Sequence, residues 1–407
     1  MLKDIHFSYL LFGRFVSNAS GSIVTMVLAW LILENTENSL WLGFFYATLF
    51  LPDIFSFLVG GLIDRYSKKK LLIGLELGSA LFTLLVAAAL INRQEGLTIS
   101  MFVIICVLAF GVNFFATNTF SVQHAYVQQS IVKQDLEKAS RNLSTMYKIS
   151  NYTFGLLTGF LMLHIHNIGL IFVGAMCYII SSILFLKLKE MDVSTNTVEE
   201  KQGTTIGRKK SNVWLGFRYI FASSSLTAIT LTGGVINFFF AGLPIYLLRI
   251  AGEQGSPLVL GLLNSGMMLG GFIGTALVSG TIFKNFAVGH KHIVNYVLFG
   301  LGLIITGWVA QDWLIIIGLA VSGVFWGVTH VTHNPIKQTL APAQHLGKIS
   351  TAENTLAVGT MPLGALFFGQ LGEGIPIQVF FLLFGLVYLM SALLYIKITE
   401  IRTFSLE

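Results

Sequence analysis

The sequence predicts an all-α integral membrane protein with twelve membrane-spanning helices in two halves of six. Of its 407 residues, 54% are hydrophobic and 11% are charged, whereas soluble domains carry about 25% charged residues. A surface this apolar has to face lipid. Apolar runs of about 20 residues, the length that crosses a bilayer, recur along the whole chain. One long polar segment, 189–212, separates the first six runs from the last six.

The predicted spans follow one another with mostly short connections. The first half contains roughly 8–33, 40–63, 71–92, 99–122, 144–164 and 168–188. The second half contains roughly 226–250, 258–283, 293–310, 313–334, 351–372 and 376–397.

The distribution of lysine and arginine predicts the orientation, because cytoplasmic loops carry an excess of both. With the N-terminus inside, the outer side receives only Arg93 and Arg249. The cytoplasmic side receives Lys68, Lys69, Lys70, Lys133, Lys138, Arg141, Lys201, Arg208, Lys209, Lys210, Lys284, Lys291, Lys337, Lys348, Lys397 and Arg402, among others. We therefore expect a multi-pass protein of the cell (plasma) membrane, with both termini and the central segment in the cytoplasm.

Several classes of function are excluded by what the sequence lacks. Cys106 and Cys177 lie inside apolar runs without CxxC or histidine-rich spacing, so they read as small core residues and predict neither a disulfide nor a metal site. The net charge of +6 belongs to residues at the membrane face, which argues against nucleic-acid binding. There is no nucleotide-binding motif and no catalytic constellation. We expect no cofactor and no enzymatic activity.

The segment between spans two and three, GGLIDRYSKKKLLIG, begins at Gly60. It lacks the GxxxxGK[ST] pattern of a phosphate-binding loop and reads as a tight cytoplasmic turn between two membrane helices. Gly60 permits close helix approach, and Asp64 can accept from helix N-terminal amides or pair with a basic group. The Gly60-x-x-x-Asp64 spacing returns as Gly280-x-x-x-Lys284, about half the chain later, as an internal duplication requires.

The pattern Gly60-x-Leu62-x-Asp64-Arg65-x-Ser67-Lys68-Lys69-x-x-Leu72 resembles the loop signature of the major facilitator superfamily, G-x-L-x-D-R-x-G-R-K-x-x-L. It departs from that signature at Ser67, where the family has glycine. The resemblance implies two pseudo-symmetric six-helix bundles, 1–188 and 213–407, joined by a cytoplasmic linker, 189–212, and working by alternating access. It also implies that the loop steadies the outward-facing state. The predicted cytoplasmic gate consists of Gly60, Asp64, Arg65, Lys68, Lys69 and Glu76.

Three further segments resemble the macrolide-efflux-type group of drug:proton antiporters. They are Phe120–Ser150, which looks like the segment joining spans four and five, Trp214–Phe221, an amphipathic lead-in to span seven, and Gly347–Thr351 before span eleven. Span five departs from the usual antiporter element, because it has Gly155 and Gly159 but no proline.

Ionisable residues inside a membrane span are functional candidates, because their insertion costs roughly 2.5–3.5 kcal/mol. Asp53, directly after Pro52 near the middle of span two, is expected to carry a proton or bind substrate. The alternative is a hydrated or paired carboxylate. Arg14 in span one is expected to snorkel toward the cytoplasmic face, to pair with a carboxylate, or to contact substrate. Glu76 is expected to join a charge network near the loop or to carry a proton. Glu353, at the start of span eleven, is expected to be similar but structural, for example as a helix N-terminal charge.

Two histidines, His330 and His333, lie three residues apart on span ten and share a helix face. Without a third ligand in reach they predict no zinc site. We interpret them as a polar patch near the cytoplasmic mouth, with a pH-sensitive gate as the alternative.

Uncharged polar residues also occur within the spans, and some must line a cavity, because an unsatisfied amide facing lipid is disfavoured. The asparagines among them are Asn18, Asn113, Asn118, Asn151, Asn237 and Asn264. Phenylalanine clusters such as 238–240 suit an apolar pocket. The glycine-rich segments 266–280 and 359–374 predict close helix packing.

Taken together, the residues and the resemblance predict a monomeric exporter of amphipathic small molecules, such as macrolide drugs, driven by proton antiport. Its partners are the substrate, protons and membrane lipids. Two alternatives remain open: export of one endogenous metabolite such as a siderophore, and a proton-independent lipid flippase or sensor of the same fold.

Overall fold

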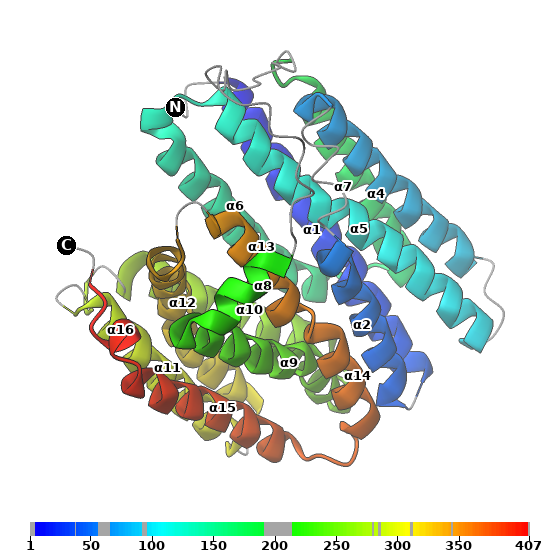
Figure 1. The fold of residues 1–407 in the computed structure, drawn as a ribbon. Coiled ribbons are helices and arrows are strands. Elements are labelled where there is room, and N and C mark those ends of the chain that lie inside the picture. Colours follow the sequence, from blue (N-terminus) through cyan, green and yellow to red (C-terminus); the bar gives the residue numbers. More distant parts are fainter. Residues whose placement is uncertain are drawn as a thin grey trace. The chain divides into compact units, whose positions relative to one another are not determined.

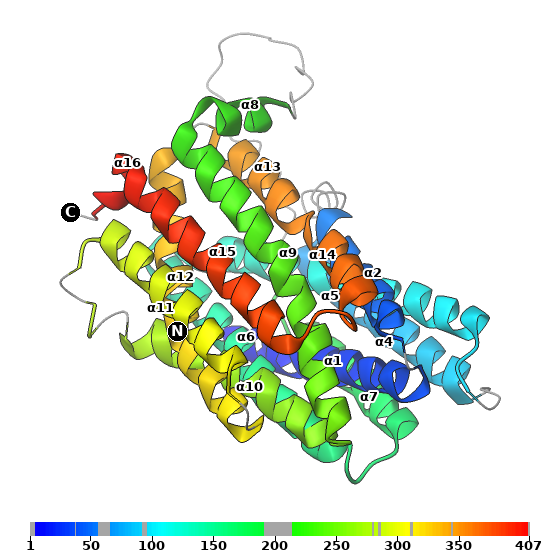
Figure 2. The same ribbon diagram turned by 90° about the horizontal axis from the view of Figure 1, so that it is seen from below.

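A computed structural model of the protein describes residues 5–36, 38–55, 66–91, 96–190, 214–278, 281–283, 286–309, 312–342 and 345–405. Every regular element within these ranges is a helix (Figures 1 and 2). The helices are α1 (Ile5–Asn35), α2 (Ser39–Phe55), α4 (Lys68–Ile91), α5 (Ile99–Ser130), α6 (Lys133–Leu161), α7 (Asn167–Leu186), α8 (Trp214–Ala222), α9 (Ser224–Glu253), α10 (Pro257–Ile273), the π-helix η1 (Gly274–Val278), α11 (Val288–Gly307), α12 (Asp312–Leu340), α13 (Leu346–Val358), α14 (Met361–Leu371), α15 (Ile377–Lys397) and α16 (Thr399–Arg402).

The predicted spans largely correspond to these helices. Within the described residues, nine helical segments are long and apolar enough to cross a membrane. These are Ile5–Asn35, Lys68–Ile91, Ile99–Ser130, Asn167–Leu186, Ser224–Glu253, Pro257–Ala276, Val288–Gly307, Trp313–Lys337 and Ile377–Lys397. The predicted spans two, five and eleven correspond to α2, α6 and the pair α13 and α14. The count of twelve spans stays a prediction.

Span eleven differs from the continuous helix that the apolar run predicts. It forms two helices, α13 and α14, with a break at Gly359 and Thr360. Pro362 lies in the first turn of α14, where its missing N–H leaves no hydrogen bond unmade. In a continuous helix its ring would clash with the carbonyl of Val358, four residues earlier. Proline therefore restarts the helix here.

Polar caps define where two long helices begin. The Thr98 hydroxyl accepts from the Met101 amide at 3.3 Å at the start of α5. The Ser223 hydroxyl accepts from the Leu226 amide at 3.3 Å and separates the short α8 from α9. Each satisfies an amide that has no partner within the helix. The amphipathic lead-in expected before span seven is α8, with Trp214 and Phe221 exposed on it.

The chain divides into two compact units. Unit 1 comprises 1–25, 51–150 and 168–214, and unit 2 comprises 26–50, 151–167 and 215–407. The unit boundaries fall within α1, α2 and α6 and at the first residues of α7 and α8, and they differ from the boundaries of the predicted halves. Most of the linker 189–212 lies outside the described residues, so the division into bundles 1–188 and 213–407 stays a prediction.

In unit 1, α4 and α5 pack side by side along their length (Figure 1). The rings of Phe82 and Phe115 occupy the space beside Gly111 and Gly78, where a larger side chain would overlap them. On another face of the unit, the Ser181 hydroxyl of α7 donates to the carbonyl of Gly13 on α1 at 3.0 Å. A buried apolar cluster is built from residues of α1, α4, α5, α6 and α7.

In unit 2, α11 lies between α12 and α15 and packs against both (Figure 2). The tightest packing joins α10 and η1 to α12. A Cβ at Gly270 would lie 1.9 Å from the carbonyl oxygen of Ala320, and one at Gly327 would lie 2.1 Å from that of Gly271. Only glycine permits backbones to approach this closely, so the close packing predicted for segment 266–280 is confirmed.

The predicted gate is only partly described. Gly60, Asp64 and Arg65 lie outside the described residues, as do Gly280 and Lys284 of the second copy. Lys68 and Lys69 form the first turn of α4.

Candidate functional site

Arg14 of α1 lies buried in unit 1 with only 5% of its surface exposed. Its guanidinium carbon is 4.7 Å from the centre of the Phe120 ring on α5 and 4.8 Å from that of Tyr147 on α6. The two ring centres are 5.5 Å apart, so the rings form a corner that holds the guanidinium. Cations bind favourably to aromatic faces at such distances. The sequence did not predict this aromatic partnership.

Glu76 of α4 is fully buried in the same unit. Its Oε1 accepts from the Ser17 hydroxyl on α1 at 2.9 Å. The carboxylate attracts Arg14 electrostatically, but the two side chains form no direct ion pair. Glu76 therefore joins α4 to α1, and the loop residue Asp64, with which a network was predicted, lies outside the described residues.

The remaining predicted polar residues of unit 1 lie on α1, α2 and α5. Asn18 donates to the Ser150 hydroxyl at 2.7 Å. Asn118 is fully buried and donates to the carbonyl of Phe114 at 2.7 Å, and Asn113 is half-buried on the same helix. Asp53 is also half-buried, and its side chain hydrogen-bonds Thr117.

Unit 2 contains a cavity of about 430 Å³ lined by α9, α11, α12, α13, α14 and α15. Its apolar wall includes Phe240 of α9 and Trp326 of α12, whose rings stack with centres 5.8 Å apart. Tyr296 and Tyr388 extend this wall. The predicted phenylalanine pocket is thus divided: Phe240 lines the cavity, whereas Phe239 stacks on the fully buried Phe384 in the core.

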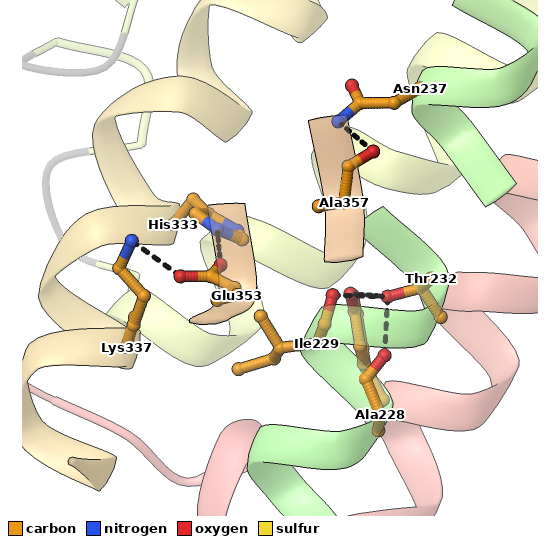
Figure 3. A network of polar contacts seen from close by, with 9 residues as sticks. Ala228, Ile229, Thr232, Asn237, His333, Lys337, Glu353 and Ala357 are labelled. Carbon is orange, nitrogen blue, oxygen red and sulfur yellow. Dashed lines mark hydrogen bonds and ion pairs between the residues drawn. The ribbon is translucent and has the colours of Figure 1, made fainter. Parts of the chain in front are cut away.

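The polar side of this cavity is a cluster of three ionisable groups, which we call the charge trio: His333, Lys337 and Glu353. Figure 3 shows His333 and Lys337 extending from α12 toward Glu353 on α13. Lys337 Nζ is 2.7 Å from one carboxylate oxygen, and His333 Nε2 is 3.3 Å from the other. Glu353 is 7% exposed. The expectation that it is a helix N-terminal charge is wrong, because it lies two turns into α13 and neutralises Lys337 instead.

The two histidines of span ten both line the cavity, as their shared helix face predicted. His330 meets the Trp326 ring edge-on at 4.4 Å. Behind them the fully buried ring of His292 on α11 hydrogen-bonds the Thr332 hydroxyl at 2.7 Å. In the described residues no group of three or more His, Cys, Asp or Glu side chains is arranged to hold a metal ion.

Of the asparagines predicted in unit 2, only Asn237 lines this cavity, and it donates to the carbonyl of Ala357 at 3.0 Å (Figure 3). Asn264 donates to the Leu260 carbonyl of its own helix at 3.1 Å. Asn151 is half-buried on α6. Lys337 is a site residue that was not predicted from the sequence, although His330, His333 and Lys337 fall at i, i+3 and i+7, which is one helical face.

A second cavity in unit 2 is a weaker candidate. It has a volume of about 460 Å³, and its lining includes Glu34, Arg249 and Glu373. Glu34 accepts from the Trp30 indole and Glu373 from the Ser39 amide, both at 2.6 Å. Arg249 donates to a backbone carbonyl. These polar groups are engaged within the protein, and Trp30 is the one phenylalanine, tyrosine or tryptophan in this lining. The cavity with the charge trio has four such rings, so it offers a ligand a larger aromatic surface and is the better candidate.

Comparison with known proteins supports a transporter fold. A sequence model described as Major Facilitator Superfamily matches residues 10–357. No curated protein matches the chain. A structure of the nucleoside transporter NupG aligns with a TM-score of 0.73 at 12% identity, covering 97% of this chain and 98% of its own.

Two other solved structures are similar in the same way. The POT family transporter PepTSo aligns with a TM-score of 0.70 at 11% identity, covering 96% of this chain and 97% of its own. A bacterial homologue of the iron transporter ferroportin aligns with a TM-score of 0.69 at 15% identity, covering 98% and 99%. At such identities the likeness shows the fold alone.

Proposed function

The chain belongs to the major facilitator superfamily of membrane transporters, and from this premise we propose that it exports amphipathic small molecules by proton antiport. The observation that carries the proposal is the unit 2 cavity, where stacked aromatic rings face a charge trio. Such a surface fits a ligand with an apolar body and a polar group.

Two carboxylates support proton coupling. Asp53 lies in the apolar helix α2 directly after Pro52 and hydrogen-bonds the Thr117 hydroxyl. Glu353 lies in the cavity wall, where its bond to Lys337 can be exchanged for a proton. In alternating access, protons arriving from outside and substrate arriving from inside load the carrier in different states. We propose Asp53 as the main coupling residue.

The proposed setting is the plasma membrane, with both termini cytoplasmic and the protein acting as a monomer. The lysines at the start of α4 support this orientation. We further propose that the loop containing Gly60 and Asp64 acts as the cytoplasmic gate.

The second candidate is export of one endogenous metabolite, such as a siderophore. This candidate is favoured by the polar residues in the cavity lining, which include His330, Asn237 and Asn354. A purely apolar drug would form no hydrogen bonds with such residues. Deletion of the gene distinguishes the two: a lost extracellular metabolite with unchanged drug sensitivity favours the metabolite. Transport that persists with an uncoupler would instead indicate a proton-independent flippase.

Removal of the Asp53 carboxyl group tests the coupling. In inside-out vesicles that contain the full chain and an imposed pH gradient, addition of erythromycin or ethidium is expected to release protons. Asp53→Asn is expected to abolish this release, because an amide cannot carry the proton. Asp135→Asn, in the first turn of α6, is the control. Normal proton release by Asp53→Asn would rule out the assignment.

A further inference from the structure

The guanidinium of Arg14 has no hydrogen-bond acceptor in the described part of the chain. Its Nε is fully buried without a partner, and no ion pair or hydrogen bond joins its other nitrogens to a described residue. A guanidinium presents five N–H donors in one plane. A buried donor that has no acceptor lowers the stability of the folded protein. Such a group needs an explanation beyond packing.

The aromatic corner explains how Arg14 is held but leaves its donors unused. Phe120 and Tyr147 contact the guanidinium through their ring faces, which provide no acceptor for in-plane N–H bonds. The nearby carboxylate of Glu76 accepts from Ser17 through Oε1 and attracts Arg14 electrostatically, but it forms no hydrogen bond or ion pair with the guanidinium. The side chain is therefore held between two rings, while no described residue accepts a hydrogen bond from its Nε.

We propose that Arg14 anchors the anionic group of transported molecules that carry one, so that the preferred substrate is an amphipathic organic anion of the carboxylate class. This inference rests on the proposed export function and specifies its substrate. A carboxylate fits because it accepts two parallel N–H bonds in the plane of the guanidinium. Phe120 and Tyr147 supply an apolar surface for an aromatic body next to that group.

The cavity of unit 2 offers no free carboxylate to a cation. Its lining contains Lys337, His330 and His333 against one carboxylate, Glu353, which is already paired with Lys337. A cationic ligand would meet no unpaired negative charge on these side chains.

The test measures binding of three probes that share one ring system to the purified full-length protein in detergent. The probes are 2-naphthoate, 2-naphthamide and 2-naphthylmethylammonium, which differ chiefly in charge. Wild-type protein is expected to bind 2-naphthoate about tenfold or more tightly than 2-naphthamide, because a charge-assisted bidentate pair replaces a neutral bond. The cation is expected to bind most weakly.

Variants of Arg14 separate recognition from structure. Arg14→Gln is expected to bind naphthoate and naphthamide equally, and Arg14→Lys to retain a reduced preference for the anion, since it keeps the charge but loses the planar fork. Lys187→Gln is the matched control, because Lys187 is an exposed cation 5.3 Å from the Tyr9 ring in the same unit. Its preference is expected to equal that of the wild type.

Three results would overturn the inference: equal binding of the anion and the amide by wild-type protein, no binding of any probe, or a preference that survives Arg14→Gln. If Arg14→Gln does not fold, the inference is still tested by the relative binding of naphthoate and naphthamide to the wild-type protein and to Arg14→Lys. Proton-coupled export of erythromycin or ethidium without an anion preference would leave the proposed function intact and reject only this substrate class.

Discussion

A Gly270→Leu variant is expected to lose the stable fold of unit 2. Gly270 lies on α10 where that helix meets α12, and a Cβ there would lie 1.9 Å from the carbonyl oxygen of Ala320. The obstructing atom belongs to the backbone, so no side-chain rotation relieves the overlap. The two helices would have to separate, and we expect the free energy of unfolding to fall by about 3 kcal/mol or more.

The contact is reciprocal along the helix pair. A Cβ at Gly323 of α12 would lie 2.2 Å from the carbonyl oxygen of Met267, and one at Gly274 would lie 1.8 Å from that of Val324. Gly274 also begins the π-helix η1, where the backbone departs from α-helical spacing. Because each helix supplies glycines against the other's carbonyls, enlarging any one of them opens the same interface.

Thermal unfolding of the purified protein in detergent measures the effect. Gly74→Leu is the matched control, since a Cβ at this exposed α4 position meets nothing within 4 Å. Gly266→Ala provides a graded case, because its Cβ would lie 3.2 Å from the Ile316 carbonyl oxygen and requires only a small shift. We expect the melting temperature to be highest for Gly74→Leu, lower for Gly266→Ala and lowest for Gly270→Leu. A Gly270→Leu protein that melts with the Gly74→Leu control would contradict the packing argument.

The membrane architecture could be predicted from sequence because it depends on local composition. Long apolar runs specify spans regardless of what they contact, and the glycines at 266–280 indicated close packing. The partner of that packing could not be predicted. Gly323 and Gly327 lie more than forty residues later in the chain, and only the folded structure places them against α10. The break at Gly359 was missed because hydropathy does not register proline.

The candidate site could be predicted only in part, for a related reason. Arg14 stood out as a charge inside an apolar run, but its aromatic corner is assembled from three helices. Glu353 looked like a terminal charge because its partner, Lys337, belongs to another helix. Sequence patterns identify unusual residues, whereas their partners depend on tertiary contacts between distant segments.

A Glu353→Leu variant is expected to be less stable than the wild-type protein, with a loss of stability second only to that of Gly270→Leu among the variants proposed. The change leaves Lys337 and His333 facing a cavity wall without their carboxylate. Removing one member of a buried pair costs about 3–5 kcal/mol, and we expect the lower end, because Lys337 can extend its ammonium toward water. The double variant Glu353→Leu, Lys337→Met is expected to recover most of this loss, since replacing both charges with apolar groups is close to neutral.

The same variants separate the role of the charge trio in transport from its role in stability. If Glu353 exchanges Lys337 for a proton, the double variant should melt near the wild type, yet its drug-stimulated proton release should be reduced. Glu353→Gln keeps a hydrogen-bond acceptor for Lys337 but cannot titrate, so it should lose proton release with a smaller loss of stability. Normal proton release in the double variant would show that the pair only supports the fold. Proton coupling would then depend on Asp53 alone, because proton exchange is the only role in transport that we propose for the charge of Glu353.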